Sequence, residues 1–359
     1  MSYIIAIETA LPNYCHQQKD IARFFMDGTE DETIKRKLKY VSDKSGIEAR
    51  YSVINDFSST ESDNTLFTNN KIIPSLEKRM AVYQSEALLL ALQAINKIQN
   101  ISNLKSSITH IITVTCTGLF APGLDIEVML AMQLSSSVSR HSINFMGCNA
   151  AILALKQAND ICDSMANANV LIVCVELCTI HFQHNNADDN ILANILFGDG
   201  AAVTLISSNV SEQIDFPVLK INSFHSLIIP KGFNDMAWQL SSTGFLMNLT
   251  SYVSELINSN MNEFFRTIKL DKSTIDYWAI HPGGKKIVDD FAVTLQLQPQ
   301  QLQASYDVLK QCGNMSSPTI LFVLKQLIDN TVNSKTNETI FAAAFGPGIT
   351  LETMQLKYV

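Results

Sequence analysis

Short apolar runs alternate with amphipathic helical stretches along this sequence, and the alternation occurs twice, once in each half of the 359 residues. In the first half, residues 80–98 show helical apolar spacing, and residues 108–116 (ITHIITVTC) are rich in the β-branched side chains that favour strands. In the second half, a strand-like run at 277–280 precedes a helical stretch at 284–295. This pattern predicts an α/β protein in which helices cover both faces of the sheets.

No sharp linker divides the two halves, so we expect residues 1–210 and 211–359 to share one compact body. A polar, irregular stretch at 53–66 predicts a loop. The other predicted strands span 3–6, 170–174, 201–206, 218–223 and 339–345, and the other predicted helices span 17–25, 249–265 and 317–329.

The run at 144–158 (NFMGCNAAILALKQA) places a cysteine between a strand-like stretch and an apolar helix. Gly147 permits a sharp turn, and Asn149 is of a residue type that caps helix N-termini. Cys148 would then face the positive end of the helix dipole, which lowers the pKa of a thiol and favours the nucleophilic thiolate. A lone cysteine is more often a small buried side chain, so this interpretation depends on partners elsewhere in the chain.

Two polar residues supply candidate partners for Cys148. His281 follows an apolar strand-like run and precedes Pro-Gly-Gly, and Asn314 lies in a polar turn (CGNMSS) that opens a helix. Strand ends and helix starts are where α/β proteins place reactive groups. Cysteine with histidine can form a thiolate–imidazolium pair, and an asparagine amide can stabilise an oxyanion without adding charge. Taken singly, His281 also fits a structural role and Asn314 fits a helix cap.

The bulk properties exclude several other classes of protein. The net charge is −8 without a long basic block, which argues against nucleic-acid binding, and no apolar run reaches the roughly 20 residues that span a membrane. The first residues lack a basic leader and predict a first strand rather than a signal peptide. The seven cysteines are scattered without a CxxC pair, so we expect no metal site, no disulfide framework and a reduced, cytoplasmic enzyme.

Five short motifs, in order along the chain, resemble the type III polyketide synthases, the chalcone synthase-like family. The resemblance covers nearly the whole chain, and the reactive residues Cys148, His281 and Asn314 fall inside its motifs. The motifs are GCNAA at 147–151, LFGDGAA at 196–202, IHPGG at 280–284, GNMSS at 313–317 and the terminal AFGPG at 344–348.

This resemblance implies a thiolase fold, in which two similar halves form a layered αβαβα body that is usually a homodimer. Residues 1–210 would carry the nucleophile, and residues 211–359 would carry the histidine and the asparagine. An acyl-CoA starter would be loaded on Cys148, while His281 and Asn314 would assist decarboxylation of malonyl-CoA, Claisen condensation and later cyclisation. No metal or carrier group is required in the family, so we expect no cofactor beyond the CoA thioester substrates.

Further family positions are matched in part. Phe197 matches the first gatekeeping phenylalanine between tunnel and cavity, and Ser316 matches a serine near the nucleophile. The second gatekeeping phenylalanine corresponds to Met247, whose flexible side chain predicts looser gating. Lys37 and Lys44 match cationic positions that pair with CoA phosphates. Their intervening arginine is replaced by Tyr40, and Lys285 and Lys286 are candidate replacements, although all four lysines also fit ordinary surface charge.

The expected cavity lining departs most from plant chalcone synthases. Cys116, Cys178 and His181 stand where threonines are usual, and Trp238 stands where glycine is usual. The two bulky rings should reduce or redirect the space for a growing chain. Cys116 resembles a cysteine of bacterial members, although a buried core thiol fits equally well. The loop at 121–123 lacks the methionine that plant members project across the dimer interface. We therefore expect an alkylpyrone, alkylresorcinol or phloroglucinol-type product rather than a chalcone.

Three alternatives remain open at the level of sequence. A ketoacyl synthase III-like enzyme shares the cysteine, histidine and asparagine but condenses once with a carrier-bound malonyl group. A papain-like protease also uses these residue types, although nothing in the sequence indicates secretion or disulfides. A thiolase-fold scaffold that binds acyl-CoA without turnover is the non-catalytic alternative.

Overall fold

The computed structural model describes residues 1–359 except 59–65, 68–72, 185–186, 211–215, 251 and 331–335. Of the loop predicted at 53–66, residues 59–65 lie outside this description, and the described remainder forms neither helix nor strand. No helix of the described chain has the length and apolar character needed to cross a membrane.

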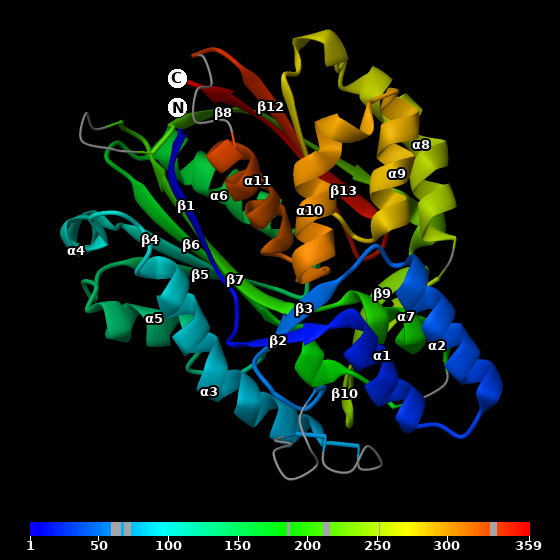
Figure 1. Ribbon diagram of the computed structural model, residues 1–359. Helices are drawn as coiled ribbons and strands as arrows, with labels where there is room; N and C mark the ends of the chain where they lie inside the picture. Colours follow the sequence, from blue (N-terminus) through cyan, green and yellow to red (C-terminus); the bar gives the residue numbers. More distant parts are fainter. Residues whose placement is uncertain (59–65, 68–72, 185–186, 211–215, 251, 331–335) are drawn as a thin grey trace.

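Within the described residues, nine strands form one continuous sheet with the order β11-β12-β13-β8-β1-β7-β6-β4-β5 (Figure 1). The strands from the first half are β1 (Tyr3–Ala10), β4 (His110–Thr115), β5 (Ser139–Asn144), β6 (Asn169–Leu177) and β7 (Asp199–Ser207). The strands from the second half are β8 (Leu219–Ile228), β11 (Tyr277–Ile280), β12 (Thr339–Gly346) and β13 (Thr350–Tyr358).

The two halves use the same strand arrangement. In each half the first strand pairs antiparallel with the last one, β1 with β7 and β8 with β13. In each half a parallel pair lies further out, β4 beside β6 and β11 beside β12. The halves join where β1 pairs with β8, at Tyr3 opposite Lys220 and Ile4 opposite Leu219. This repeated order is the structural form of the alternation seen twice in the sequence.

Helices α6 (Ala150–Ser164) and α11 (Thr319–Asn330) lie between the two parts of the sheet, because each contacts strands from both halves. Helices α3 (Leu76–Ile95) and α5 (Leu124–Met132) cover the outer face of the first half. Helices α8 (Val253–Thr267) and α9 (Lys285–Leu295) cover the outer face of the second half, beside α10 (Gln303–Cys312). The predicted layered αβαβα arrangement is therefore confirmed.

Alternating side chains on the buried strands explain why helices cover both faces. On β12, Phe341 and Phe345 belong to the outer core beneath α8 and α9, whereas Ala342 and Ala344 belong to the middle core with α6 and α11. Successive strand residues point to opposite faces, so a strand that is apolar throughout must be covered twice. The small alanines leave room for the two central helices.

The elements that surround the predicted site lie in the lower part of Figure 1, from its centre to its right side. They are β2 (Tyr14–Gln17), α1 (Gln18–Asp27), α2 (Glu32–Lys44), β3 (Ala49–Ser52), α7 (Asp188–Leu196), β9 (Met236–Ser241) and β10 (Gly244–Leu249). The β9–β10 hairpin was not predicted, and the helix predicted at 249–265 begins only at Val253. The strand predicted at 3–6 is confirmed as the start of β1.

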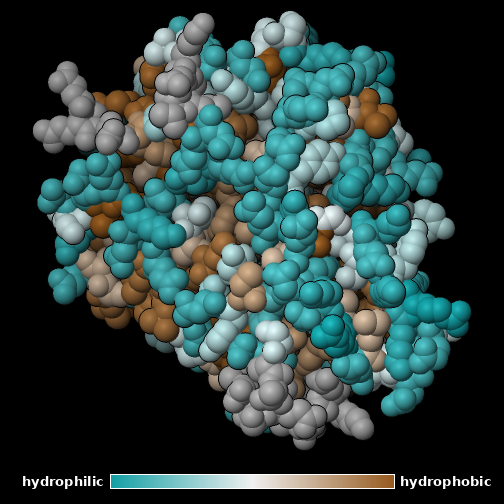
Figure 2. Space-filling view, viewed as in Figure 1, coloured by the Kyte–Doolittle hydropathy of each residue, from teal (hydrophilic) through white to brown (hydrophobic). Residues whose placement is uncertain are grey.

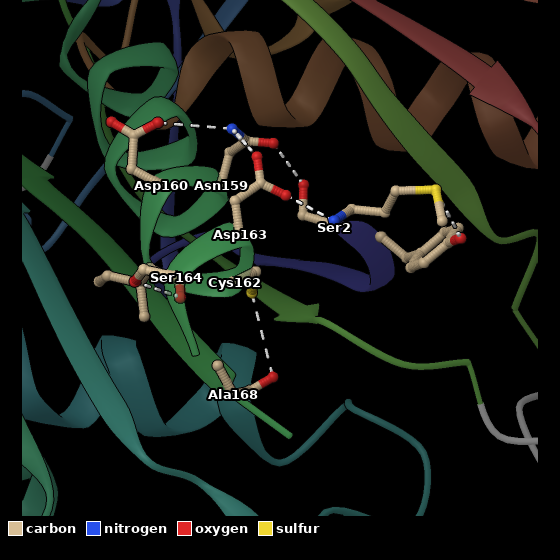
Figure 3. Close-up of polar contacts among 10 residues, drawn as sticks. Ser2, Asn159, Asp160, Cys162, Asp163, Ser164 and Ala168 are labelled. Carbon is tan, nitrogen blue, oxygen red and sulfur yellow. Dashed lines mark hydrogen bonds and ion pairs between the residues drawn. The ribbon is translucent and has the colours of Figure 1, made fainter. Parts of the chain in front are cut away.

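The first residues of the chain are bound to the C-terminal end of α6 (Figure 3). The Ser2 hydroxyl donates to Asn159 Oδ1 at 2.7 Å, and the amino group of Met1 lies 2.5 Å from Asp163 Oδ1. Asn159 in turn donates to Asp163 Oδ2 at 3.2 Å. A positive charge is favourable at the negative end of a helix dipole. These contacts hold α6 at the end opposite the predicted nucleophile.

Candidate active site

The turn before Cys148 requires glycine. Gly147 has φ +86°, in the left-handed region, and a Cβ atom there would lie 2.0 Å from Pro347 Cδ. Its amide donates to Cys116 Sγ at 3.1 Å. The turn is thereby fixed between the end of β4 and the Pro347 turn that connects β12 to β13, so the predicted sharp turn at Gly147 agrees with the structure.

Asn149 occupies the N-cap position of α6, but its side chain does not cap the helix, so that part of the sequence interpretation is wrong. Its Nδ2 instead donates to Thr350 Oγ1 at 2.8 Å. Gly346 leaves room for the amide in this position, because a Cβ atom at 346 would lie 2.4 Å from Asn149 Oδ1. Asn149 therefore ties the nucleophile helix to the last strand of the sheet.

Asn314 is held by a short parallel bridge to Phe197, with Gly198 N donating to Asn314 O at 2.9 Å and Asn314 N donating to Leu196 O at 3.0 Å. Its side-chain Oδ1 accepts from Ser316 N at 2.8 Å, which fixes the orientation of the amide. The amide nitrogen Nδ2 then lies 3.8 Å from Cys148 Sγ. Asn314 thus presents a donor to the thiol.

His281 follows β11 and is 1% exposed. Within the described residues, neither of its ring nitrogens has a hydrogen-bond partner. An unpaired buried polar group is costly, so such a group needs a separate explanation. Burial lowers the pKa of His281 to about 3, and the imidazole is therefore neutral near pH 7.

The lowered thiol pKa expected from the helix dipole is not found for Cys148. Burial raises its pKa to about 11, and hydrogen bonds from Ser316 and Asn314 oppose that rise. The surrounding protein desolvates the half-buried thiol, and a neutral His281 supplies no positive charge to stabilise a thiolate. Near pH 7, Cys148 is therefore a thiol and His281 is a neutral imidazole.

A cavity of about 380 Å³ opens above these groups, and almost every predicted site residue lines it. The lining side chains that the sequence predicted are Cys148, His281, Asn314, Phe197, Met247, Ser316, Cys116, Cys178, His181 and Trp238. The structure thus brings together residues from both halves of the chain. In the part of the chain that is described, no cluster of three or more His, Cys, Asp or Glu side chains is placed to hold a metal ion.

One wall of the cavity is a packed group of rings, which we call the aromatic wall: His181, Trp238 and Phe245. His181 stacks on Phe245 with ring centres 4.3 Å apart, and Trp238 meets both rings edge-on at 6.0 Å. Trp238 Nε1 donates to Cys116 O at 2.7 Å. His181 Nε2 donates to Thr117 O at 2.8 Å and its Nδ1 accepts from Phe245 N at 3.2 Å, so both ring nitrogens are paired and the ring is neutral.

Among the described residues, the lysines that line the cavity are exposed to solvent, which places them at its mouth. Lys44, Lys285 and Lys286 line it together with Tyr40, whereas Lys37 does not line it and forms an ion pair with Asp188. Lys285 is also paired, at 2.7 Å from Asp289 Oδ2.

Sequence reasoning missed Glu176, a buried carboxylate behind the cavity. Glu176 Oε2 accepts from Cys116 N and from the Thr117 hydroxyl, both at 2.8 Å, and Oε1 accepts from the Ser317 hydroxyl at 2.7 Å. Burial raises its pKa to about 7. A single acidic residue inside the apolar strand VLIVCVEL was the available signal, because such a residue is rarely buried without partners.

Comparison with protein families gives two matches that together cover most of the chain. The model for the N-terminal domain of chalcone and stilbene synthases matches residues 1–210. The model for the C-terminal domain of the same enzymes matches residues 220–359.

Several solved structures share the fold over the whole chain. The PKS-I structure from the brown alga Ectocarpus siliculosus has a TM-score of 0.91 at 24% identity, with 100% of this chain and 98% of that chain covered. The C-terminal type III polyketide synthase domain of Steely1 from Dictyostelium has a TM-score of 0.88 at 25% identity, with coverages of 100% and 99%. The 1,3,6,8-tetrahydroxynaphthalene synthase from Streptomyces coelicolor A3(2) has a TM-score of 0.87 at 24% identity, again with 100% and 99% covered.

Proposed function

Because this chain belongs to the chalcone and stilbene synthases, a family of type III polyketide synthases, we propose that it loads an acyl-CoA starter on Cys148 and extends it with malonyl-CoA. The observation that carries the proposal is the arrangement at Cys148. The Asn314 amide lies 3.8 Å from its sulfur. The buried imidazole of His281, which has no hydrogen-bond partner among the described residues, lines the same cavity.

In the loading step, the sulfur of Cys148 attacks the thioester carbonyl of the starter while neutral His281 accepts the thiol proton. The new bond joins Cys148 Sγ to the acyl carbon, and the bond between that carbon and the CoA sulfur breaks. The proton then passes from His281 to the departing CoA. Burial keeps the imidazole of His281 neutral near pH 7, and only the neutral ring can accept a proton.

In the extension step, Asn314 Nδ2 and a ring N–H of His281 donate to the thioester oxygen of malonyl-CoA as carbon dioxide leaves. The resulting enolate carbon attacks the acyl carbonyl on Cys148, and the cysteine sulfur leaves with the electron pair of the broken bond. Fixed donors aimed at a developing oxyanion are a main source of catalysis in such sites. The hydrogen bond from Ser316 N holds the Asn314 amide in the orientation that this step needs.

The cavity supports a small, neutral product rather than a chalcone. Its volume of about 380 Å³ lies at the lower end of the range for ligand sites. The bulky rings of Trp238 and His181 line the cavity and reduce the space for a growing chain. Cys116 and Cys178 also line it, and both thiols are uncharged because burial raises their pKa. We propose an alkylpyrone, alkylresorcinol or phloroglucinol-type product from an aliphatic starter, with Phe197 and Met247 as the gate.

The substrates would be held at the mouth by their phosphates. Lys44 and Lys286 are exposed, line the cavity and have no ion-pair partner within the described residues, so they are the first choice for this role. Lys37 would have to exchange Asp188 for a phosphate before it could contribute. The scheme uses acyl-CoA and malonyl-CoA as substrates and no further cofactor.

The surface supports a homodimer. Strand β5 forms the edge of the sheet and, among the described strands, pairs only with β4. Figure 2 shows apolar surface on the left side of the molecule, where α5 lies in Figure 1, and Leu130 on α5 is 74% exposed. The seven unpaired cysteines support a reducing, cytoplasmic location.

Mass spectrometry of products from the pure protein, malonyl-CoA and a panel of acyl-CoA starters tests this function. We expect a cyclised product that contains two or more malonyl-derived units, and no loading at all in Cys148→Ala. A product with a single extension would favour the ketoacyl synthase III-like alternative. Acylated Cys148 without any product would favour the non-catalytic scaffold.

A further inference from the structure

Three consecutive carbonyl groups at the C-terminal end of α7 are each bound by a different part of the chain. Ile195 O accepts from Gln18 Nε2 at 2.8 Å, Leu196 O accepts from Asn314 N at 3.0 Å, and Phe197 O accepts from Arg50 Nη1. Helix ends leave such carbonyls without partners inside the helix, so these contacts decide where the helix ends and where Phe197 points.

Arg50 is completely buried and lies directly against the bridge that joins Phe197 to Asn314. A Cβ atom at Gly313 would lie 2.9 Å from both Cγ and Cδ of Arg50, and one at Gly198 would lie 3.5 Å from its Cβ. The two glycines that flank the bridge therefore leave space for the arginine side chain. The arginine supports this bridge from behind the cavity, because it does not line the cavity itself.

The charge of Arg50 is only partly compensated. Its Nε donates to Gln18 Oε1 at 2.9 Å and its guanidinium lies 5.5 Å from the centre of the Phe182 ring. Within the described chain, Nη2 has no hydrogen-bond partner. Asp199 interacts with it electrostatically, but the Asp199 oxygens accept hydrogen bonds from Thr179 and from Val53 N. A buried charge of this kind is weak grounds for stability alone.

We propose that Arg50 is a positioning residue for the reaction. By holding the Phe197 carbonyl, Arg50 fixes the position of the Phe197 ring at the gate. Through the bridge, it also fixes the distance between the Asn314 amide and Cys148. Gln18 assists, because it binds both Arg50 and the Ile195 carbonyl. We call Arg50 and Gln18 together the clamp. The inference rests on the proposed function for the roles of Phe197 and Asn314, but the geometry it describes exists whatever the substrate is.

A positioning role for Arg50 predicts that its substitution slows malonyl-CoA decarboxylation more than starter loading. Starter loading uses Cys148 and His281, whereas decarboxylation also needs the Asn314 donor. In Arg50→Lys, one amine cannot serve both Phe197 O and Gln18 Oε1 with the fixed geometry of a guanidinium. We expect malonyl-CoA decarboxylation to fall at least tenfold, while acylation of Cys148 falls less than threefold and the share of prematurely released short products rises.

The control is Ile95→Ala, which removes a fully buried side chain near the far end of α3. This substitution destabilises the protein at a distance from Arg50 and Gln18. It should therefore lower the rates of acylation and decarboxylation by the same factor and leave the product ratio unchanged. If Arg50→Lys does not fold, Gln18→Ala takes its place and should show the same difference between the two steps with a smaller amplitude. Equal losses in both steps, or an unchanged product ratio, would overturn the proposal.

A second readout does not depend on any polyketide activity. The Asn314 amide is a hydrogen-bond donor to the Cys148 sulfur and favours its ionisation. Alkylation of Cys148 by iodoacetamide at pH 9, followed by peptide mass spectrometry with exposed Cys15 as the internal reference, should slow about twofold in Arg50→Lys, within the limit expected for acylation, and stay unchanged in Ile95→Ala. If the wild-type protein makes no polyketide but Arg50→Lys still slows alkylation, the proposed function is rejected and the role of Arg50 stands. If Arg50→Lys leaves the alkylation rate unchanged, the role of Arg50 is rejected.

Discussion

Two regions of the same cavity each contain a buried histidine, and they differ in how the ring is bonded. In the aromatic wall, both nitrogens of His181 are paired, with Thr117 O and Phe245 N. In the reactive corner, formed by Cys148, His281 and Asn314, neither nitrogen of His281 has a partner among the described residues. Burial lowers the pKa of both rings to about 3. The two histidines therefore have similar burial and similar pKa. They differ in hydrogen bonding, since the nitrogens of His181 are bonded to the aromatic wall and those of His281 are available to a substrate.

The largest expected effects come from the reactive corner. His281→Gln and Asn314→Ala should each lower the rate of malonyl-CoA decarboxylation by about a hundredfold or more, because each removes a donor to the developing oxyanion. The rate is measured by release of labelled carbon dioxide. Normal turnover in either variant would remove that residue from the mechanism and weaken the contrast between the two regions.

Acid stability provides a direct comparison of the two histidines. An unfolded histidine titrates near pH 6.5, so between pH 6.5 and 3 the unfolded chain binds protons that the folded chain does not. The free energy of unfolding therefore falls with acid, and each histidine lowers it by about 2 kcal/mol at pH 5 relative to its value well above pH 6.5. Calorimetry should show a shallower fall of Tm with acid in both His181→Phe and His281→Gln.

The same two variants should differ at pH 7.5. His181→Phe removes the hydrogen bonds to Thr117 O and from Phe245 N and should lower Tm. His281→Gln removes no hydrogen bond among the described residues and should change Tm little. Equal Tm values for the two variants at pH 7.5 would contradict the distinction drawn here.

Trp238→Gly should change the product profile with a smaller effect on rate, because it opens the aromatic wall without touching the reactive corner. We expect longer or differently cyclised products by liquid chromatography and mass spectrometry. Trp238→Phe is the matched control, since it keeps a ring but loses the hydrogen bond to Cys116 O. A wild-type profile in Trp238→Gly would show that this wall does not limit the product.

The smallest effects are expected at the mouth. Lys44→Ala and Lys286→Ala should each raise the KM for malonyl-CoA about threefold, and the effect should shrink at high salt because exposed charges are screened. Lys37→Ala should have less effect, because Lys37 is already paired with Asp188. Steady-state kinetics at low and high ionic strength measures this, and a larger effect for Lys37 than for Lys44 would reverse the assignment.

Apolar periodicity predicted the alternation, because it is a local signal. The αβαβα layers and most of the residues that meet in the cavity were implied by the resemblance to a known family, which rests on short motifs. Sequence reasoning missed the β9–β10 hairpin, since 236–249 has no strict alternation and its pairing depends on cover from α7. It misassigned Asn149, because the amide is oriented by donation from Nδ2 to Thr350 Oγ1, about 200 residues away, and its Oδ1 does not accept from the helix. The high thiol pKa of Cys148 and the fully bonded state of His181 depend on burial by distant segments, which no local motif encodes.

The contact of Gly147 with Pro347, and of Asn149 with Thr350, has a consequence for biosynthesis. The partners are about 200 residues apart, so at ribosomal speeds about 10 to 40 s separate the emergence of the nucleophile from that of the segment that fixes its turn. A nascent or stalled chain that ends before this segment contains Cys148 but lacks the support for its geometry. Reactivity of this thiol toward CoA thioesters is therefore expected only after residues 347–350 have been synthesised, which keeps shorter nascent chains from becoming acylated.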